Sequence, residues 1–334
     1  MDLAMLLEWT VKSAVMVAAL LGGFAYLTLL ERRVLARMQV RIGPNRAGPW
    51  GLLQPVADGI KLVFKEELIP AQADRALFVL APIATVIPAL ILLAVIPLGP
   101  DVEILGRTVR LSLAADLNVG VLYIAAVTSI AVYGIVIAGW ASGNKYALLG
   151  GVRSTAQMVS YELPLALVLV GPILLAGSMS VHEIVRDQQH LWYAVLQPVG
   201  FVVWVIASLA EVNRAPFDMP EAEQELTAGY HVEYSGMKFA LFFMAEYVKM
   251  IGVSVIGATL FLGGYWGPGV EQAPLLGPLW LLLKTLALVF GQLWLRATLP
   301  RFRYDRLMAF GWKILLPLSV LNVMTTAVLV VLGW

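Results

Sequence analysis

The residues best suited to chemistry in this sequence are carboxylates that lie within or beside apolar segments long enough to cross a membrane. Glu162 and Glu246 lie inside such segments, and Glu211 ends another. A carboxylate in the bilayer costs roughly 2.5–3.5 kcal/mol on insertion scales, so it needs a partner, water or a proton. These positions therefore predict either proton transfer or pairing with a buried cation.

A polar hinge between residues 211 and 236 joins two apolar segments and concentrates acidic groups. Its acidic residues are Glu211, Asp218, Glu221, Glu223, Glu225 and Glu233. Such a cluster between two hydrophobic helices predicts an aqueous pocket or a protein partner rather than lipid. A solvated acidic loop is the simpler interpretation, and it suits Glu221 and Glu223.

Several of these residues can also have a purely structural role instead of transferring protons. Glu246 and Lys249 are three residues apart, so they can pair on one helix face. Glu162 can be hydrogen-bonded as a neutral group in a helix interface. Lys284 has no acidic neighbour in the sequence, so it must find one in space or lose its proton.

The composition is that of an integral membrane protein. The chain has 334 residues, of which 60% are hydrophobic and 13% charged, against about 25% charged in soluble proteins. It has no cysteine, which excludes cysteine-ligated iron–sulfur clusters, and its three histidines lie outside the long apolar runs. Any redox cofactor that the protein serves is therefore expected in other subunits.

Apolar segments of spanning length need about 20 residues and predict about eight transmembrane helices in one polytopic domain covering residues 1–334. The segments lie near residues 11–30, 76–98, 117–140, 155–177, 192–210, 237–263, 279–299 and 312–332. The fold class is thus an all-α membrane protein. Asp2 and Glu8 give the N-terminus the wrong charge for a signal peptide, so the first segment is interpreted as a retained anchor.

The distribution of lysine and arginine predicts the orientation. Most basic residues fall in four loops that the positive-inside rule places in the cytoplasm, near residues 31–75, 141–154, 211–236 and 300–311. The opposite side has only Lys12, Arg107, Arg110 and Arg186. Both termini are therefore expected on the periplasmic side of a bacterial inner membrane.

The first cytoplasmic loop carries a cationic turn and then an amphipathic pattern. Arg41 and Arg46 flank Gly and Pro residues, which favour turns. After Pro49, apolar residues recur at helical spacing, whereas Asp58 and Lys61 fall on other faces. The pattern predicts a helix in the membrane interface, for which a simple surface anchor is the plainer interpretation.

Three long stretches resemble the membrane protein of respiratory complex I that is known as its H subunit, and the mitochondrial equivalent of that protein. They read ERRVLARMQVRIGPNRAGPWGLLQPVADGIKLVFK (31–65), GWASGNKYALLGGVRSTAQMVSYE (139–162) and EVNRAPFDMPEAEQELTAGYHVEYSGMKFALFFMAEY (211–247). The resemblance implies a non-redox membrane component of a proton-pumping NADH:quinone oxidoreductase. Such a component supplies part of the quinone chamber and the first proton-transfer path.

The resemblance also implies roles for individual residues. Those expected to transfer protons are Glu162, Glu211, Glu221, Glu223, Glu225, Glu233 and Glu246. Those expected to line or position the quinone path are Arg33, Arg41, Asp58 and Lys61. Some relatives carry another glutamate where this chain has Ser129, so a relay there must use water or a different group.

Cofactors and partners follow from the same resemblance. Quinone is expected as substrate, no cofactor or metal is expected on this chain, and FMN and iron–sulfur clusters are expected in partner subunits. The partners are peripheral-arm and membrane-arm subunits, lipid quinone and membrane lipids, and nucleic acid is not among them. The alternatives are the equivalent component of a membrane-bound hydrogenase or ferredoxin-dependent relative, and a free-standing proton-coupled transporter. No repeat between the chain halves is evident, which disfavours the transporter.

Overall fold

The computed structural model describes residues 3–104, 107–109, 112–114, 117–219 and 229–333. The long helices are α1 (Leu3–Met38), α3 (Arg75–Ile91), α4 (Gly120–Ala141), α5 (Lys145–Ala176), α10 (Gly236–Phe261), α11 (Leu276–Thr298) and α13 (Leu316–Val331). The shorter helices are α2 (Gln54–Phe64), α6 (Val181–Asp187), α7 (Tyr193–Leu196), α8 (Pro198–Glu211) and α12 (Tyr304–Phe310). The 3-10 turns are η1 (Pro49–Gly51), η2 (Leu92–Val95) and η3 (Gly229–His231), and the π-helical turn η4 (Gly311–Leu315) joins α12 to α13.

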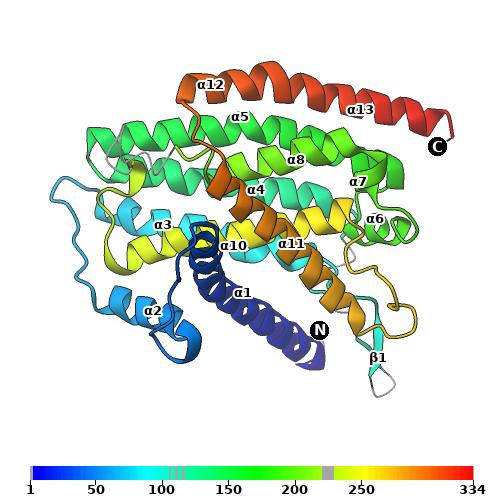
Figure 1. Cartoon of the computed structure of the whole chain (residues 1–334), viewed down its shortest axis with the longest axis horizontal. Coiled ribbons are helices and arrows are strands. Elements are labelled where there is room, and N and C mark those ends of the chain that lie inside the picture. The colour runs from blue at the N-terminus through cyan, green and yellow to red at the C-terminus, as the bar shows by residue number, and fades with distance from the viewer. Residues whose placement is uncertain (1–2, 105–106, 110–111, 115–116, 220–228, 334) are drawn as a thin grey trace.

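The predicted all-α membrane class is confirmed. Within the described residues, seven helical stretches are long and apolar enough to cross a membrane. A two-stranded hairpin of β1 (Val102–Ile104) and β2 (Arg107–Val109) is a small addition, with Val102 paired to Val109. In Figure 1 both termini and β1 lie toward one end of the bundle and α2 toward the other.

The fifth predicted segment, 192–210, does not form one spanning helix but two shorter helices, α7 and α8. After α7, helix α8 has only 14 residues, or about 21 Å, whereas the hydrocarbon core is about 30 Å thick. Asn213 has a left-handed backbone (φ 57°), which ends the helical path one turn before Pro216. The chain therefore leaves α8 inside the bundle, and Glu211 is buried there with 3% of its surface exposed.

Two of the predicted loops are shorter than expected because helices continue past their apolar segments. Helix α1 extends to Met38, so it includes residues 31–38 of the first loop. The predicted loop 141–154 is mostly the first turns of α5, which begins where the Asn144 side chain accepts a hydrogen bond from the Tyr146 amide (2.9 Å). Backbone hydrogen bonds and such caps do not depend on hydrophobicity. The ends of the apolar segments in the sequence therefore do not coincide with the ends of the helices.

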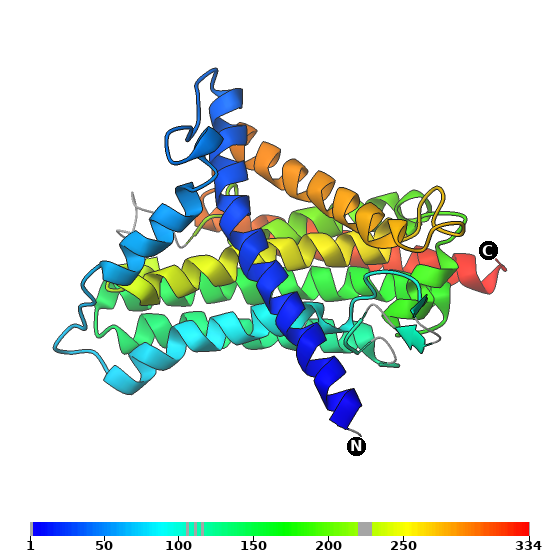
Figure 2. The same ribbon diagram turned by 90° about the horizontal axis from the view of Figure 1, so that it is seen from below.

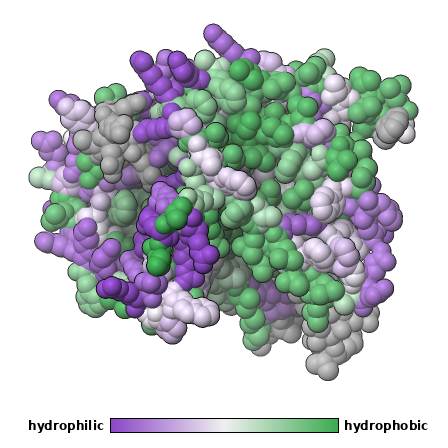
Figure 3. Space-filling model, in the orientation of Figure 1, coloured by the Kyte–Doolittle hydropathy of each residue, from purple (hydrophilic) through white to green (hydrophobic). Residues whose placement is uncertain are grey.

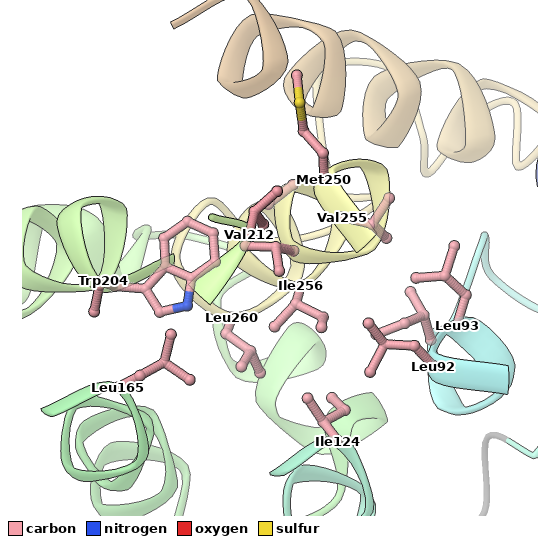
Figure 4. Packing of buried hydrophobic residues seen from close by; sticks show 14 of the residues in the cluster. Leu92, Leu93, Ile124, Leu165, Trp204, Val212, Met250, Val255, Ile256 and Leu260 are labelled. Carbon is pink, nitrogen blue, oxygen red and sulfur yellow. The ribbon is translucent and has the colours of Figure 1, made fainter. Parts of the chain in front are cut away.

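Helix α10 lies in the middle of the bundle, where large apolar residues from several helices meet. Figure 4 shows Trp204 of α8, Leu165 of α5, Ile124 of α4 and Leu92 of η2 around it. A Cβ atom on Gly257 of α10 would lie 2.1 Å from the Trp204 ring, so only glycine permits this approach. Small residues at such crossings allow close helix packing in membranes.

Hydrophobic residues dominate the middle of the face drawn in Figure 3, and hydrophilic ones gather toward its two ends.

The predicted amphipathic segment of the first loop is helical, as α2. None of its residues is buried, and Val56, Ile60 and Val63 of its apolar side are 54–59% exposed. Figure 2 shows α2 beside the far end of α1, off the main bundle.

Candidate functional site

Two buried charged residues, Glu31 and Arg214, are at the centre of an ion-pair network among four elements. Arg214, from the hinge after α8, lies 3.2 Å from the Glu31 carboxylate of α1 and also pairs with Glu246 of α10. Glu31 pairs in addition with Arg296 of α11. Glu31 and Arg214 are 3% and 4% exposed, so the network lies in the bundle interior and joins α1, α10 and α11 through the hinge.

Arg214 is the centre of this network and stays charged. Burial by itself would lower the pKa of Arg214, but the carboxylates of Glu246 and Glu31 raise it above its ordinary value. Its guanidinium also lies 4.2 Å from the centre of the Tyr247 ring. A planar guanidinium can donate hydrogen bonds to two carboxylates along its edges while its face packs against an aromatic ring. A lysine ammonium has no such flat face.

A second buried pair lies next to this network. The Lys249 ammonium of α10 is 2.9 Å from the Glu211 carboxylate and 3.3 Å from the Glu211 backbone carbonyl at the end of α8. The spacing in the sequence also allowed Lys249 to pair with Glu246 on its own helix. Lys249 instead reaches α8, because the early end of that helix places the Glu211 carboxylate beside α10.

A cavity of about 40 Å³ separates the two charge systems. Its wall includes Glu211, Glu246 and Lys249, together with His231 and Tyr230 from η3. A water molecule needs about 10–15 Å³ of such space and two to four polar partners, so the cavity has room for a few waters.

Glu162 lies apart from this cavity and contacts the Ser129 hydroxyl, which links α5 to α4. Both side chains are partly buried. The same hydroxyl lies 2.9 Å from the Ala125 carbonyl. It has one hydrogen, so it can donate to an ionised Glu162, or donate to Ala125 and accept from a protonated Glu162. Ser129 can thus partner either protonation state.

Gln157 of α5 fixes the hinge that carries Glu211 and Arg214. The Gln157 side chain is fully buried, and its amide nitrogen lies 2.7 Å from the Ala210 carbonyl and 2.6 Å from the Phe217 carbonyl. These bonds hold the first part of the hinge, from Ala210 to Phe217, against the helix that bears Glu162. The hinge is therefore attached to α5 by neutral hydrogen bonds and to α1 and α10 by ion pairs.

Glu233 does not line the cavity. The Glu233 carboxylate accepts a hydrogen bond from the Asn144 side chain (2.7 Å), at the start of α5. Glu221, Glu223 and Glu225 lie outside the described residues.

The structure brings together only part of the predicted quinone-binding set. Asp58 of α2 pairs with Arg32 of α1 at 2.7 Å and lies 3.9 Å from Lys61. Arg41 bonds to the side chain of Gln39 in the turn after α1 (2.7 Å). Arg33 packs against Gly43, where a Cβ atom would be 3.2 Å from the Arg33 Cα. Asp58 and Lys61 thus form one site with Arg32. Arg33 follows Arg32 on α1, and Arg41 lies in the turn after that helix.

Sequence reasoning missed Glu31, Arg32, Arg214, Arg296 and Gln157 as members of these sites. One signal was present, since Glu31 and Arg296 each stand at the end of a long apolar run. Lys284 was expected to need a carboxylate partner or to lose its proton. Its ammonium instead donates to the carbonyls of Leu262, Gly264 and Trp266 at 2.6–3.0 Å, just after α10 ends.

Within the described part of the chain, no group of three His, Asp or Glu side chains is placed to hold a metal ion.

Comparison with known proteins finds relatives that match most of the chain. The family model described as NADH dehydrogenase matches residues 11–327. The H subunit of the NADH-quinone oxidoreductase of Thermomicrobium roseum is 54% identical over 319 residues, covering 92% of each chain. Its counterpart in Protochlamydia amoebophila is 54% identical with 91% of each chain covered, and one in Geobacter metallireducens is 48% identical over 99% of this chain and 97% of its own.

Proposed function

Because the chain belongs to the NADH dehydrogenase family and is, like its relatives, a membrane subunit of an NADH-quinone oxidoreductase, we propose that it forms part of the quinone chamber and the first proton-transfer path of that enzyme. The observation that carries the proposal is the cavity where Glu211, Glu246 and Lys249 meet inside the bundle. Carboxylates and a lysine around water-sized space are groups that hold and pass protons. The relatives' names favour this enzyme over a hydrogenase-type complex or a free-standing transporter.

The proposed path starts in the hinge and ends on α5. Protons enter at Glu221, Glu223, Glu225 and Glu233, reach the cavity at Glu211 and Glu246, and leave toward Glu162 and Ser129. Reduction of a quinone to a quinol takes up two electrons and two protons. The quinol is neutral, so the groups that supply the two protons are left with more negative charge. Neighbouring carboxylates titrate as a coupled set, and such a charge change shifts the proton affinity of the whole set.

The proposed quinone chamber lies beside α2. The apolar side of α2 suits a prenyl tail, and the cluster of Arg32, Asp58 and Lys61 suits a polar head group. Arg33 of α1 and Arg41 of the turn after α1 add positive charge nearby. The chain would hold no cofactor of its own, with FMN and iron–sulfur clusters in partner subunits of the peripheral arm.

Replacing Asp58 by asparagine tests the quinone assignment. The change keeps the side-chain size but removes the charge that pairs with Arg32, so we expect quinone reduction to fall about tenfold, which corresponds to about 1.4 kcal/mol. Electron transfer to a soluble artificial acceptor should stay near normal, because that acceptor does not use the chamber. Replacing Glu67 by glutamine is the control, since Glu67 pairs with Lys238 at the surface (2.5 Å). Equal loss of both activities in the assembled Asp58 variant would contradict the assignment.

The orientation is also a proposal, with the hinge in the cytoplasm and both termini in the periplasm. It rests on the lysine and arginine distribution and on the positions of the termini in Figure 1. The chain has no cysteine, so single cysteines are specific probes of it. Cysteine at Asn45 should react with impermeant reagents only from the cytoplasmic side and cysteine at Gln272 only from the periplasmic side. Both residues are exposed. The reverse labelling pattern would overturn the orientation.

A further inference from the structure

His231 lines the charged cavity but has no part in the path proposed for the protons. It shares the cavity wall with Glu211, Glu246 and Lys249. The structure also describes the two other histidines of the chain, and both lie outside this wall. Histidine is the only side chain that ordinarily changes its charge between pH 5 and pH 8. A histidine at this position is therefore suited to carrying protons at neutral pH.

The two described carboxylates of the cavity wall are each held by a cation. Glu211 pairs with Lys249 at 2.9 Å, and Glu246 pairs with Arg214. A proton that enters the cavity therefore meets carboxylates that are already engaged in ion pairs. A neutral base in the same wall is a better first acceptor, and the imidazole of His231 is such a base.

His231 connects the cavity to the outer part of the hinge. Glu233 lies two residues later and outside the cavity wall, where its carboxylate accepts a hydrogen bond from the Asn144 side chain (2.7 Å). His231 itself is partly exposed in this chain, whereas its Nδ1 atom is buried. An imidazole has two ring nitrogens, so it can take up a proton on one and release a proton from the other.

Aromatic rings and close backbone packing hold this imidazole in position. The ring centres of Tyr230 and Phe239 lie 4.1 Å and 5.9 Å from that of His231. Its own turn, η3, packs closely on α5, because a Cβ atom on Gly150 would lie 2.5 Å from the Gly229 Cα. Aromatic rings also attract cations, so these neighbours stabilise the imidazolium that forms when a proton is taken up.

We propose that His231 is a further proton-transfer group, which receives protons from the hinge and passes them to water in the cavity. From this water a proton reaches Glu211 or Glu246. The inference rests on the proposed proton path and adds to it a named group at its entry into the cavity. Each transfer breaks one N–H or O–H bond and forms another, and the imidazole is neutral again after each proton has passed.

Replacing His231 by phenylalanine tests this proposal in the purified, assembled complex. Phenylalanine keeps an aromatic ring beside Tyr230 and Phe239 but cannot carry a proton, so quinone reduction should fall about 100-fold. Electron transfer to a soluble artificial acceptor should stay near normal, which shows that the complex is intact. His190→Phe is the matched control, since His190 is exposed and does not line the cavity, and it should leave both activities unchanged.

Replacing His231 by alanine gives an independent measurement. Alanine leaves space in the wall, so imidazole added to the solution should raise quinone reduction severalfold in this variant. Imidazole should not raise it in the phenylalanine variant, in which the ring fills that space.

Two results would overturn the proposal. Normal quinone reduction by the assembled phenylalanine variant would mean that the ring of His231 serves only in packing. Failure of imidazole to raise the rate of the assembled alanine variant would mean that the loss is not one of proton transfer. Neither result would remove the proton path itself, which is tested separately by variants of Glu162 and Glu211.

Discussion

Proton pumping and coupled quinone reduction should both fall sharply when Glu162 and Glu211 are replaced together by glutamine. Glutamine keeps the size and much of the hydrogen bonding of glutamate but has no exchangeable charge. A positioned proton-transfer group typically contributes at least about 100-fold to a rate, so a loss of that order is expected in coupled turnover. Proton uptake and quinone reduction are measured in vesicles that contain the assembled complex.

Three controls separate proton transfer from a structural effect. Oxidation of the electron donor with an artificial acceptor should be unchanged, because that chemistry belongs to partner subunits. Glu271→Gln changes an exposed carboxylate and should leave pumping normal. Glu211→Gln combined with Lys249→Met removes both charges of one buried pair, so it tests whether an unpaired Lys249 causes the defect. Full pumping by the assembled Glu162 and Glu211 double variant would leave the carboxylates as structural groups.

Loss of Arg214 should have the largest effect on stability. Replacing Arg214 by glutamine removes the shared partner of Glu31 and Glu246 and leaves carboxylates with less compensation in the interior. Breaking a buried ion pair in this way costs about 3–5 kcal/mol, which is a large part of the stability of a typical fold. We expect little assembled complex in membranes, and a lowered thermal midpoint for what does assemble.

Two further variants show whether burial and geometry cause this effect. Arg303 pairs with Asp305 at 3.2 Å, but the two side chains are 80% and 64% exposed, so Arg303→Gln should change stability by about 1 kcal/mol or less. Arg214→Lys keeps the charge but cannot contact both carboxylates through one planar group, so partial recovery is expected. Normal assembly of Arg214→Gln would mean that the network does not stabilise the fold.

Both experiments concern the contacts that hold the hinge in place. Some of these contacts are neutral hydrogen bonds, and the others are ion pairs. Gln157 holds the hinge backbone to α5, whereas Arg214 ties it to α1 and α10. A movement of the hinge would therefore change the surroundings of Glu211 and Glu31 together. The proposed quinone chamber at α2 and the proposed proton path adjoin the same helix, α1, through Arg32 and Glu31.

The sequence by itself determined the membrane class, seven of the spanning helices and the helix α2, and it identified the carboxylates that we propose to transfer protons. Each of these is encoded within about 20 consecutive residues, as apolar length, helical spacing or the type of a side chain. The three long matching stretches also determined the family. The absence of cysteine excluded cysteine-ligated iron–sulfur clusters on this chain. The distribution of lysine and arginine predicted the orientation. Both inferences use residue identities alone.

Only the tertiary structure decided which charges are paired. Lys249 could have paired with Glu246 on its own helix, and it pairs with Glu211 because α8 ends after 14 residues within the bundle. Glu31 and Arg296 are 265 residues apart in the chain, and no local pattern relates them. Ion-pair partners depend on where helices cross and how deeply their ends are buried, and these properties arise from packing of the whole bundle rather than from any one segment.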